Sequence, residues 1–162
     1  RAQLIDGQLY YMSAPSRIHH EILNFMNTEI NIYLRSKKGP CKVYPAPFAV
    51  KLFSEDDRNV VEPDISVICD PNKLTDRGCT GAPDWITEIV SPGNSSHDYV
   101  RKLNLYMDAG VREYWIVNPM EREILVYFLE QDKFKVKSYT FQNKIKVNIY
   151  DDLWIDFTEL GL

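Results

Sequence analysis

The sequence predicts a mixed α/β fold, in which a central mixed sheet is flanked by helices and extended by additional antiparallel strands. Two stretches space their apolar residues at the helical period, and apolar runs of strand length lie between them. The last third of the chain repeats short strand-like segments separated by turns. We therefore expect one long helix to pack on each face of the sheet.

The N-terminal part predicts a hairpin followed by the first long helix. Asp6-Gly7 separates two short apolar runs, which is a hairpin pattern. Ser16 is a suitable N-cap, and Gly39-Pro40 ends the helix. Between them, apolar side chains recur at steps of three and four and form one stripe: Ile18, Ile22, Phe25, Met26, Ile30, Tyr33 and Leu34.

The middle of the chain predicts strands around a second helix. Residues 42–53 have a β-like composition, with Pro45 and Pro47 favouring an edge or a bulge. Residues 60–69 and 85–90 predict strands, and residues 70–83 predict a polar loop. The remaining elements in chain order are a turn over 91–96 that caps a helix over about 97–109, Gly110 as its C-terminal stop, and a buried strand over 111–118.

Two topological expectations follow from these segments. The strand-helix-strand unit from Trp85 to Asn118 predicts a right-handed crossover between parallel strands. The C-terminal third predicts short strands over 123–128, 134–141, 145–149 and 153–155.

Composition limits the class of protein. The 162 residues fit one domain, and no apolar run approaches the roughly 18–20 residues that span a bilayer. The net charge of −4 argues against an extended nucleic-acid surface, although it permits a small basic rim around an acidic site. We see no signal peptide, and because the chain begins with Arg1 we expect a trimmed start.

The cysteines predict a location. Cys41, Cys69 and Cys79 are odd in number and lack the Cys-x-x-Cys spacing of a zinc site, so we expect free thiols in a reducing cytoplasm.

Two carboxylates and a lysine are the residues most suited to chemistry. Asp64 and Glu88 each lie in an apolar strand-like run, where an acid is costly unless it is paired, hydrogen-bonded or bound to a cation. Lys102 follows on the next helix, on the same face as Asp98 and Tyr106. Together they predict a site for one hard divalent metal and an attacking water.

Each of these residues also has a simpler interpretation. Asp64 could bond to a turn at the start of its strand, Glu88 could form a salt bridge, and Lys102 could pair with Asp98 on the helix surface. His19-His20-Glu21 lacks the His-Glu-x-x-His spacing and predicts only a polar helix start.

The motifs taken together resemble a large bacterial family of small restriction-endonuclease-like proteins, long classed as a domain of unknown function. That family lies within the PD-(D/E)XK nuclease superfamily. The resemblance spans nearly the whole chain and rests on Leu4–Gly7, Ala14–His19, Glu62-Pro63-Asp64, Gly81–Pro92, Asp98…Lys102…Tyr106 and Gly110–Val117. It implies a single restriction-endonuclease-like domain over residues 1–162, with the N-terminus truncated relative to the family.

The resemblance also implies roles for residues. Asp64 and Glu88 match the superfamily's acids, and with the backbone carbonyl of Ile89 they would hold Mg²⁺ or Mn²⁺. The lysine expected two residues after the second acid is replaced by Val90, so the resemblance transfers that role to Lys102. Asp98, Tyr106 and Glu113 match supporting positions, although Glu113 suits a structural role, and Gln3 stands where many relatives carry Glu.

The implied activity is metal-dependent hydrolysis of DNA phosphodiester bonds by a homodimer with no membrane association. Two alternatives stay open. One is a nuclease-like fold that only binds nucleic acid, which the net charge and the missing Glu-x-Lys favour. The other is a structural or self-association domain whose acids are bridged to cations.

Overall fold

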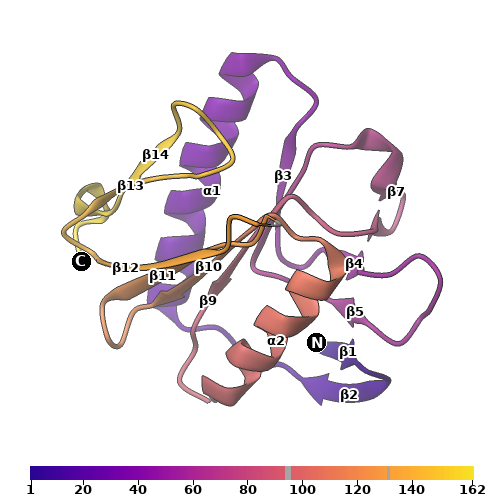
Figure 1. The fold of residues 1–162 in the computed structure, drawn as a ribbon. Coiled ribbons are helices and arrows are strands. Elements are labelled where there is room, and N and C mark those ends of the chain that lie inside the picture. The colour runs from indigo at the N-terminus through magenta and orange to yellow at the C-terminus, as the bar shows by residue number, and fades with distance from the viewer. Residues whose placement is uncertain (94–95, 131) are drawn as a thin grey trace.

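A central six-stranded sheet organises the molecule in the computed structural model, which describes residues 1–93, 96–130 and 132–162 (Figure 1). Its strand order is β12-β11-β10-β9-β6-β3. β9 and β10 are parallel, and all the other pairs in this sheet are antiparallel, so the predicted mixed sheet is confirmed. Its strands are β3 (Lys42–Pro45), β6 (Ile65–Ile68), β9 (Trp85–Ile89), β10 (Glu113–Asn118), β11 (Glu123–Phe128) and β12 (Lys135–Thr140).

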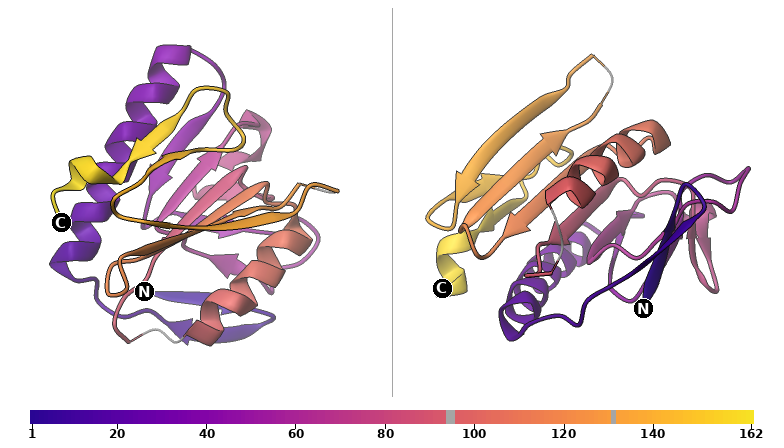
Figure 2. Two further views of the ribbon diagram at one scale, coloured as in Figure 1. Left: turned by 60° about the vertical axis from the view of Figure 1, so that its left-hand side comes forward. Right: turned by 90° about the horizontal axis from the view of Figure 1, so that it is seen from below.

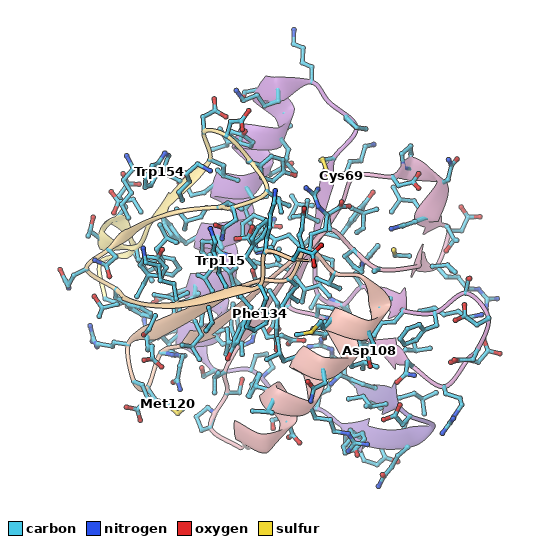
Figure 3. The ribbon with its side chains drawn as sticks, in the orientation of Figure 1. Cys69, Asp108, Trp115, Met120, Phe134 and Trp154 are labelled. Carbon is cyan, nitrogen blue, oxygen red and sulfur yellow. A yellow bond between two sulfur atoms is a disulfide. The ribbon has the colours of Figure 1, made fainter. Side chains whose placement is uncertain are left out.

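Helix α1 (Arg17–Lys37) covers one face of this sheet together with the C-terminal segment (Figure 2). The hydroxyl of Ser16 accepts a hydrogen bond from the amide of His19 at 3.2 Å, which confirms the predicted N-cap. Trp115 is fully buried in the core beneath the helix (Figure 3). The C-terminal elements are β13 (Lys144–Lys146), β14 (Trp154–Asp156) and the 3₁₀ turn η2 (Phe157–Leu160).

The opposite face carries helix α2 (Ser96–Ala109) and a second, smaller sheet. Gly110 ends α2 with a positive φ of 100°, and the amide of Val111 donates to the carbonyl of Tyr106 at 3.0 Å. The predicted capping turn includes residues 94 and 95, which lie outside the described part of the chain. The second sheet has the order β2-β1-β5-β4-β8-β7, with β1 (Ala2–Ile5), β2 (Gln8–Tyr11), β4 (Ala49–Lys51), β5 (Val60–Val61), β7 (Leu74–Thr75) and β8 (Gly78–Thr80).

The prediction of one strand over residues 60–69 is wrong. The chain forms β5 in the small sheet and β6 in the central sheet, with Glu62-Pro63-Asp64 between them. Proline has no amide hydrogen, so the ladder cannot continue through Pro63 and the chain changes sheets there. The acid that follows is therefore placed where the two sheets meet.

The polar loop expected over residues 70–83 also needs correction. This segment contains the 3₁₀ turn η1 (Pro71–Lys73) and strands β7 and β8. Gly78 permits β8 to approach β4, because a Cβ atom there would lie 2.1 Å from the carbonyl oxygen of Ala49. Strands of two or three residues carry too little periodicity to be detected in a sequence.

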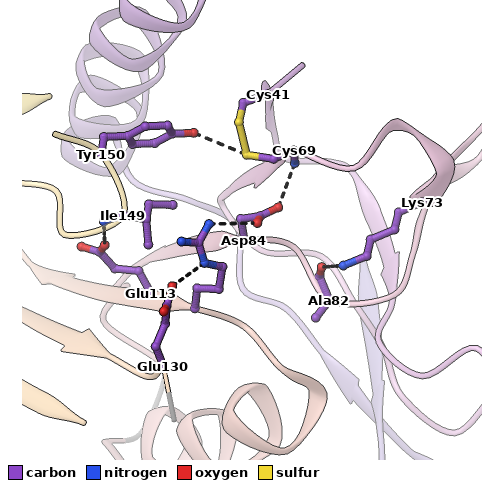
Figure 4. Close-up of polar contacts among 10 residues, drawn as sticks. Cys41, Cys69, Lys73, Ala82, Asp84, Glu113, Glu130, Ile149 and Tyr150 are labelled. Atoms are coloured by element: carbon purple, nitrogen blue, oxygen red, sulfur yellow. Dashed lines mark hydrogen bonds and ion pairs between the residues drawn. A yellow bond between two sulfur atoms is a disulfide. The ribbon is translucent and has the colours of Figure 1, made fainter. Parts of the chain in front are cut away.

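The expectation that all three cysteines are free is wrong for two of them. Cys41 and Cys69 form a disulfide (Figure 4). Cys79 is free and buried. The antiparallel pairing of β3 with β6 continues by one position to bring the two residues opposite each other. The cytoplasmic location is predicted mainly from free cysteines, so it stays a prediction that the disulfide no longer supports. No helix in the described residues is long and apolar enough to cross a membrane.

Glu113 lies at the first position of β10 and is fully buried. Its carboxylate accepts hydrogen bonds from Trp115 Nε1 at 2.6 Å and from the amides of Asn148 and Ile149 at 3.1 and 3.0 Å. The Asn148 side-chain amide adds a fourth bond at 3.1 Å. Glu113 thus fastens the C-terminal segment to the sheet on the α1 side, away from the other predicted site residues.

We expect Glu113→Ala to lower the free energy of unfolding by about 3 kcal/mol, because it leaves several buried donors without an acceptor. Chemical denaturation followed by circular dichroism measures this loss. Glu121→Ala, at an exposed acid, is the control and should stay within about 0.5 kcal/mol of the parent protein. Equal stabilities of the two variants would contradict the role given to Glu113.

Candidate active site

The pairing of β6 with β9 brings the two predicted acids together. Ile65 lies opposite Thr87 in this antiparallel pair, so the next position places Asp64 opposite Glu88. Directly opposed residues have Cβ atoms about 4.5–5.5 Å apart and point to the same face of the sheet. The side chains of Ile68, Ile86 and Val90 on that face enter the core beneath α2.

Asp64 is held at both oxygens. Oδ2 accepts a hydrogen bond from the amide of Ile89 at 2.7 Å, and Oδ1 lies 3.1 Å from Nε2 of His19. The side chain is nearly buried, and its partners come from β9 and α1 rather than from a local turn. These contacts fix the carboxylate beside the end of β9.

Glu88 receives its partners from α2. Its Oε1 accepts a hydrogen bond from the hydroxyl of Tyr106 at 2.8 Å and lies 3.2 Å from Nζ of Lys102. Lys102 is only 7% exposed, so the alternative in which it pairs with Asp98 on the helix surface is wrong. Within the described part of the chain, no hydrogen bond or ion pair uses Oε2 of Glu88.

Burial raises the pKa of Glu88 above its ordinary value. The ammonium group of Lys102 lowers that pKa, the negative charge of Asp64 raises it, and the hydrogen bond from Tyr106 lowers it. Burial and the Glu88 charge together raise the pKa of Tyr106, which stays a neutral donor. Two acids this close need a cation between or beside them if both are to be ionised at neutral pH.

His19 is a site residue that sequence reasoning missed. The sequence predicts a polar helix start at this position, yet His19 is 5% exposed and contacts Asp64. It continues the buried stripe of α1 one step before Ile22. That spacing, together with the N-cap at Ser16, could have identified its inward direction. Its Nδ1 atom is buried without a partner among the described residues.

A small cavity of about 90 Å³ opens over these groups. Asp98 lines it, as expected for a supporting residue, and so do Gln3 and the backbone region of Ile89. Gln3 is buried, and its Oε1 accepts a hydrogen bond from the amide of Glu62 at 3.1 Å. Glu113 does not belong to this cavity, because it lies on the opposite face of the sheet. Glu113 therefore does not support the site, and its hydrogen bonds agree with the structural role that the sequence favours for it.

The oxygen atoms of the two carboxylates in the site are the type of ligand that a hard cation prefers. Mg²⁺ prefers oxygen ligands, keeps most of its waters and is bound by one or two carboxylates. Asp64 and Glu88 supply such oxygens, and Oε2 of Glu88 is available among the described contacts. The described residues hold no preformed cluster of three or more acidic, histidine or cysteine ligands, so water or substrate would have to complete the shell.

A family model, a curated relative and a solved structure match this chain. The sequence profile of the Uma2 family, described as "Putative restriction endonuclease", matches residues 1–158. A Synechocystis sp. protein named "Uncharacterized protein slr1290" is 26% identical over 131 residues, which cover 80% of this chain and 67% of that protein. A crystal structure from Anabaena variabilis, described as a putative nuclease belonging to DUF820, superposes with a TM-score of 0.81 at 20% identity, covering 98% of this chain and 88% of the other. The last match shows a shared fold.

We expect Lys102→Ala to destabilise the metal-free protein in a pH-dependent way. Without the ammonium group, the folded-state pKa of Glu88 rises further above the unfolded value of about 4.3. Between the unfolded pKa of Glu88 and its higher folded pKa, the native state keeps a proton on Glu88 that the unfolded state has lost. The free energy of unfolding therefore falls as the pH rises through this interval. The loss should be about 3 kcal/mol at pH 8 and smaller at pH 4.

Denaturant titrations at the two pH values measure this difference. Lys133→Ala removes the same charge from an exposed position and serves as the control. A loss from Lys102→Ala that does not grow with pH would contradict the pairing.

Proposed function

The chain belongs to the Uma2 family, whose printed description is "Putative restriction endonuclease", and from this membership we propose that it is a metal-dependent nuclease that hydrolyses DNA phosphodiester bonds. One observation supports the proposal most strongly. Asp64 and Glu88 lie opposite each other in the register of β6 and β9, with the buried Lys102 beside them. We assign the activity to one domain over residues 1–162 and expect a homodimer, which would present two sites to two strands.

Asp64, Glu88 and the backbone carbonyl of Ile89 would hold Mg²⁺ or Mn²⁺. When bound, the ion would polarise a phosphate oxygen and acidify a water. A cation also allows both acids to be ionised at once, which their mutual repulsion otherwise opposes. The metal would thus complete an electrostatic arrangement that the protein alone leaves unbalanced.

The chain's own residues orient the reacting groups. Lys102 lies 3.2 Å from Glu88, where its ammonium can orient a water or neutralise charge on the scissile phosphate. Tyr106 and His19 fix the two acids through one oxygen each. Asp98 lines the cavity beside them and can accept a hydrogen bond from a bound water.

The alternative is a nuclease fold that binds nucleic acid or a second copy without cleaving. The missing Glu-x-Lys and the net charge of −4 support it. The geometry favours the enzyme, because a fold that only binds has no need to bury two acids and a lysine around one cavity.

We expect Asp64→Asn and Glu88→Gln each to lower Mg²⁺-dependent cleavage of DNA, measured on single-stranded and on plasmid substrates, by at least about 100-fold, while the melting temperature changes little. Both amides keep the shape of the acid but lose its charge. Asp57→Asn, at an acid whose side chain is 89% exposed, should cleave like the parent protein. Unchanged nicking by either site variant would remove the residue from the mechanism.

We also expect isothermal titration with Mn²⁺ to detect one site per chain, which Asp64→Asn should abolish and Asp57→Asn should retain. This measurement needs no DNA and does not depend on turnover. If the parent protein binds no Mn²⁺ at millimolar concentration, the non-catalytic alternative gains the support.

A further inference from the structure

The cavity over the acids is too small for a nucleotide. Its volume of about 90 Å³ is well below the roughly 300–1,000 Å³ of pockets that enclose whole small molecules. Asp64, Glu88 and Lys102 at its base are each less than 10% exposed. A phosphate group with its water can enter, but the sugar and base of the same nucleotide must stay outside. The groups at the cavity mouth therefore decide which form of nucleic acid fits.

The mouth carries two arginines despite the negative net charge. Arg101 precedes Lys102 on α2, and its guanidinium lies 5.1 Å from the centre of the Tyr10 ring and donates to the Tyr10 hydroxyl. It also lies 3.8 Å from Asp6, a distance at which the pairing is weak. Arg1 is 3.0 Å from Glu62. Both side chains are about one-third exposed, and a guanidinium has five donors, so each retains donors for a phosphate.

The mouth also presents an exposed aromatic ring. Tyr11 lines the cavity and is 81% exposed at the end of β2, which is an edge strand of the small sheet. The hairpin that carries it lies beside α2 (Figure 1), and the Arg101 contacts with Tyr10 and Asp6 hold the two together. A tyrosine ring of this kind offers a stacking surface to any base that is not already stacked.

We propose that the β1–β2 hairpin and Arg101 form a binding lip for single-stranded DNA, which rests on the proposed nuclease function of the same cavity. Arg101 and Arg1, which both line the cavity, bind phosphates next to the one inside it, and Tyr11 stacks on an unpaired base. A flexible single strand can turn one phosphate into the narrow cavity while its base lies on the rim. In a duplex the bases are stacked on each other and offer no face to Tyr11.

Fluorescence anisotropy with a labelled oligo(dT) tests the lip in EDTA, where metal-dependent cleavage cannot occur. Tyr11→Ala and Arg101→Ala should each weaken binding about tenfold, within the range measured for one stacked base. Tyr11→Phe keeps the ring and Arg101→Lys keeps the charge, so both should retain most of the affinity. Duplex DNA of equal length should bind more weakly than the single strand at the same salt concentration.

Two matched controls remove the same chemical groups elsewhere. Trp154→Ala removes an exposed aromatic on the C-terminal side of the molecule, far from the hairpin (Figure 3). Arg35→Ala removes a positive charge 16 residues along α1 from His19, about 24 Å away. Both should bind oligo(dT) within about twofold of the parent protein.

The outcomes separate this inference from the proposed function. Binding that depends on Tyr11, without any Mg²⁺-dependent cleavage, would support the lip and overturn the nuclease assignment. Nicking of duplex DNA by a protein that ignores single strands would support the nuclease and overturn the lip. Equal losses in Tyr11→Ala and Trp154→Ala would also overturn the lip, because binding would then not be local.

Discussion

The antiparallel register of β6 with β9 is the constraint on which the site depends. It sets Asp64 opposite Glu88 on one face of the sheet, and the 2.7 Å hydrogen bond from Ile89 to Asp64 fixes the pair where β6 begins and β9 ends. A slip by one residue would turn one acid to the other face. The break at Pro63 makes the arrangement possible, because β6 begins directly after it and Asp64 stands at the start of that strand, where its carbonyl accepts a hydrogen bond from the amide of Ala46 at 2.9 Å.

Both helices contribute side chains to the site because each one packs on the sheet near Asp64 and Glu88. The N-terminal turn of α1 delivers His19 to Asp64, and α2 delivers Lys102 and Tyr106 to Glu88. The partners of Glu88 do not fully offset the cost of burying its carboxylate, since burial still raises the pKa of Glu88. Buried charged groups that lower the stability of the fold are typical of functional sites.

Local patterns in the sequence are sufficient for the two helices, for the longer strands and for part of the site. Alternation placed Glu88 inward, and helical spacing placed Lys102 with Tyr106, because both depend only on near neighbours in the chain. The division of residues 60–69 between two sheets and the disulfide of Cys41 with Cys69 depend on which strands pair, which no local pattern contains. The inward direction of His19 is not predicted for another reason. A histidine at the start of a helix suggests an exposed polar turn, although His19 lies three residues before Ile22 and so continues the buried stripe of α1.

The two buried glutamates of the central sheet show how a structural acid differs from a functional one. Glu113 and Glu88 both lie in apolar strands next to each other, and burial raises the pKa of both. Glu113 accepts four hydrogen bonds over its two oxygens, all from neutral donors of the fold, so it has no reason to recruit an ion. The described contacts of Glu88 all end on Oε1, one of them comes from a cation, and a second acid faces it across the register. Burial alone would rank the two residues equally, whereas the number of hydrogen bonds that each carboxylate accepts separates them, and this difference favours Glu88 as the acid that would bind the proposed metal.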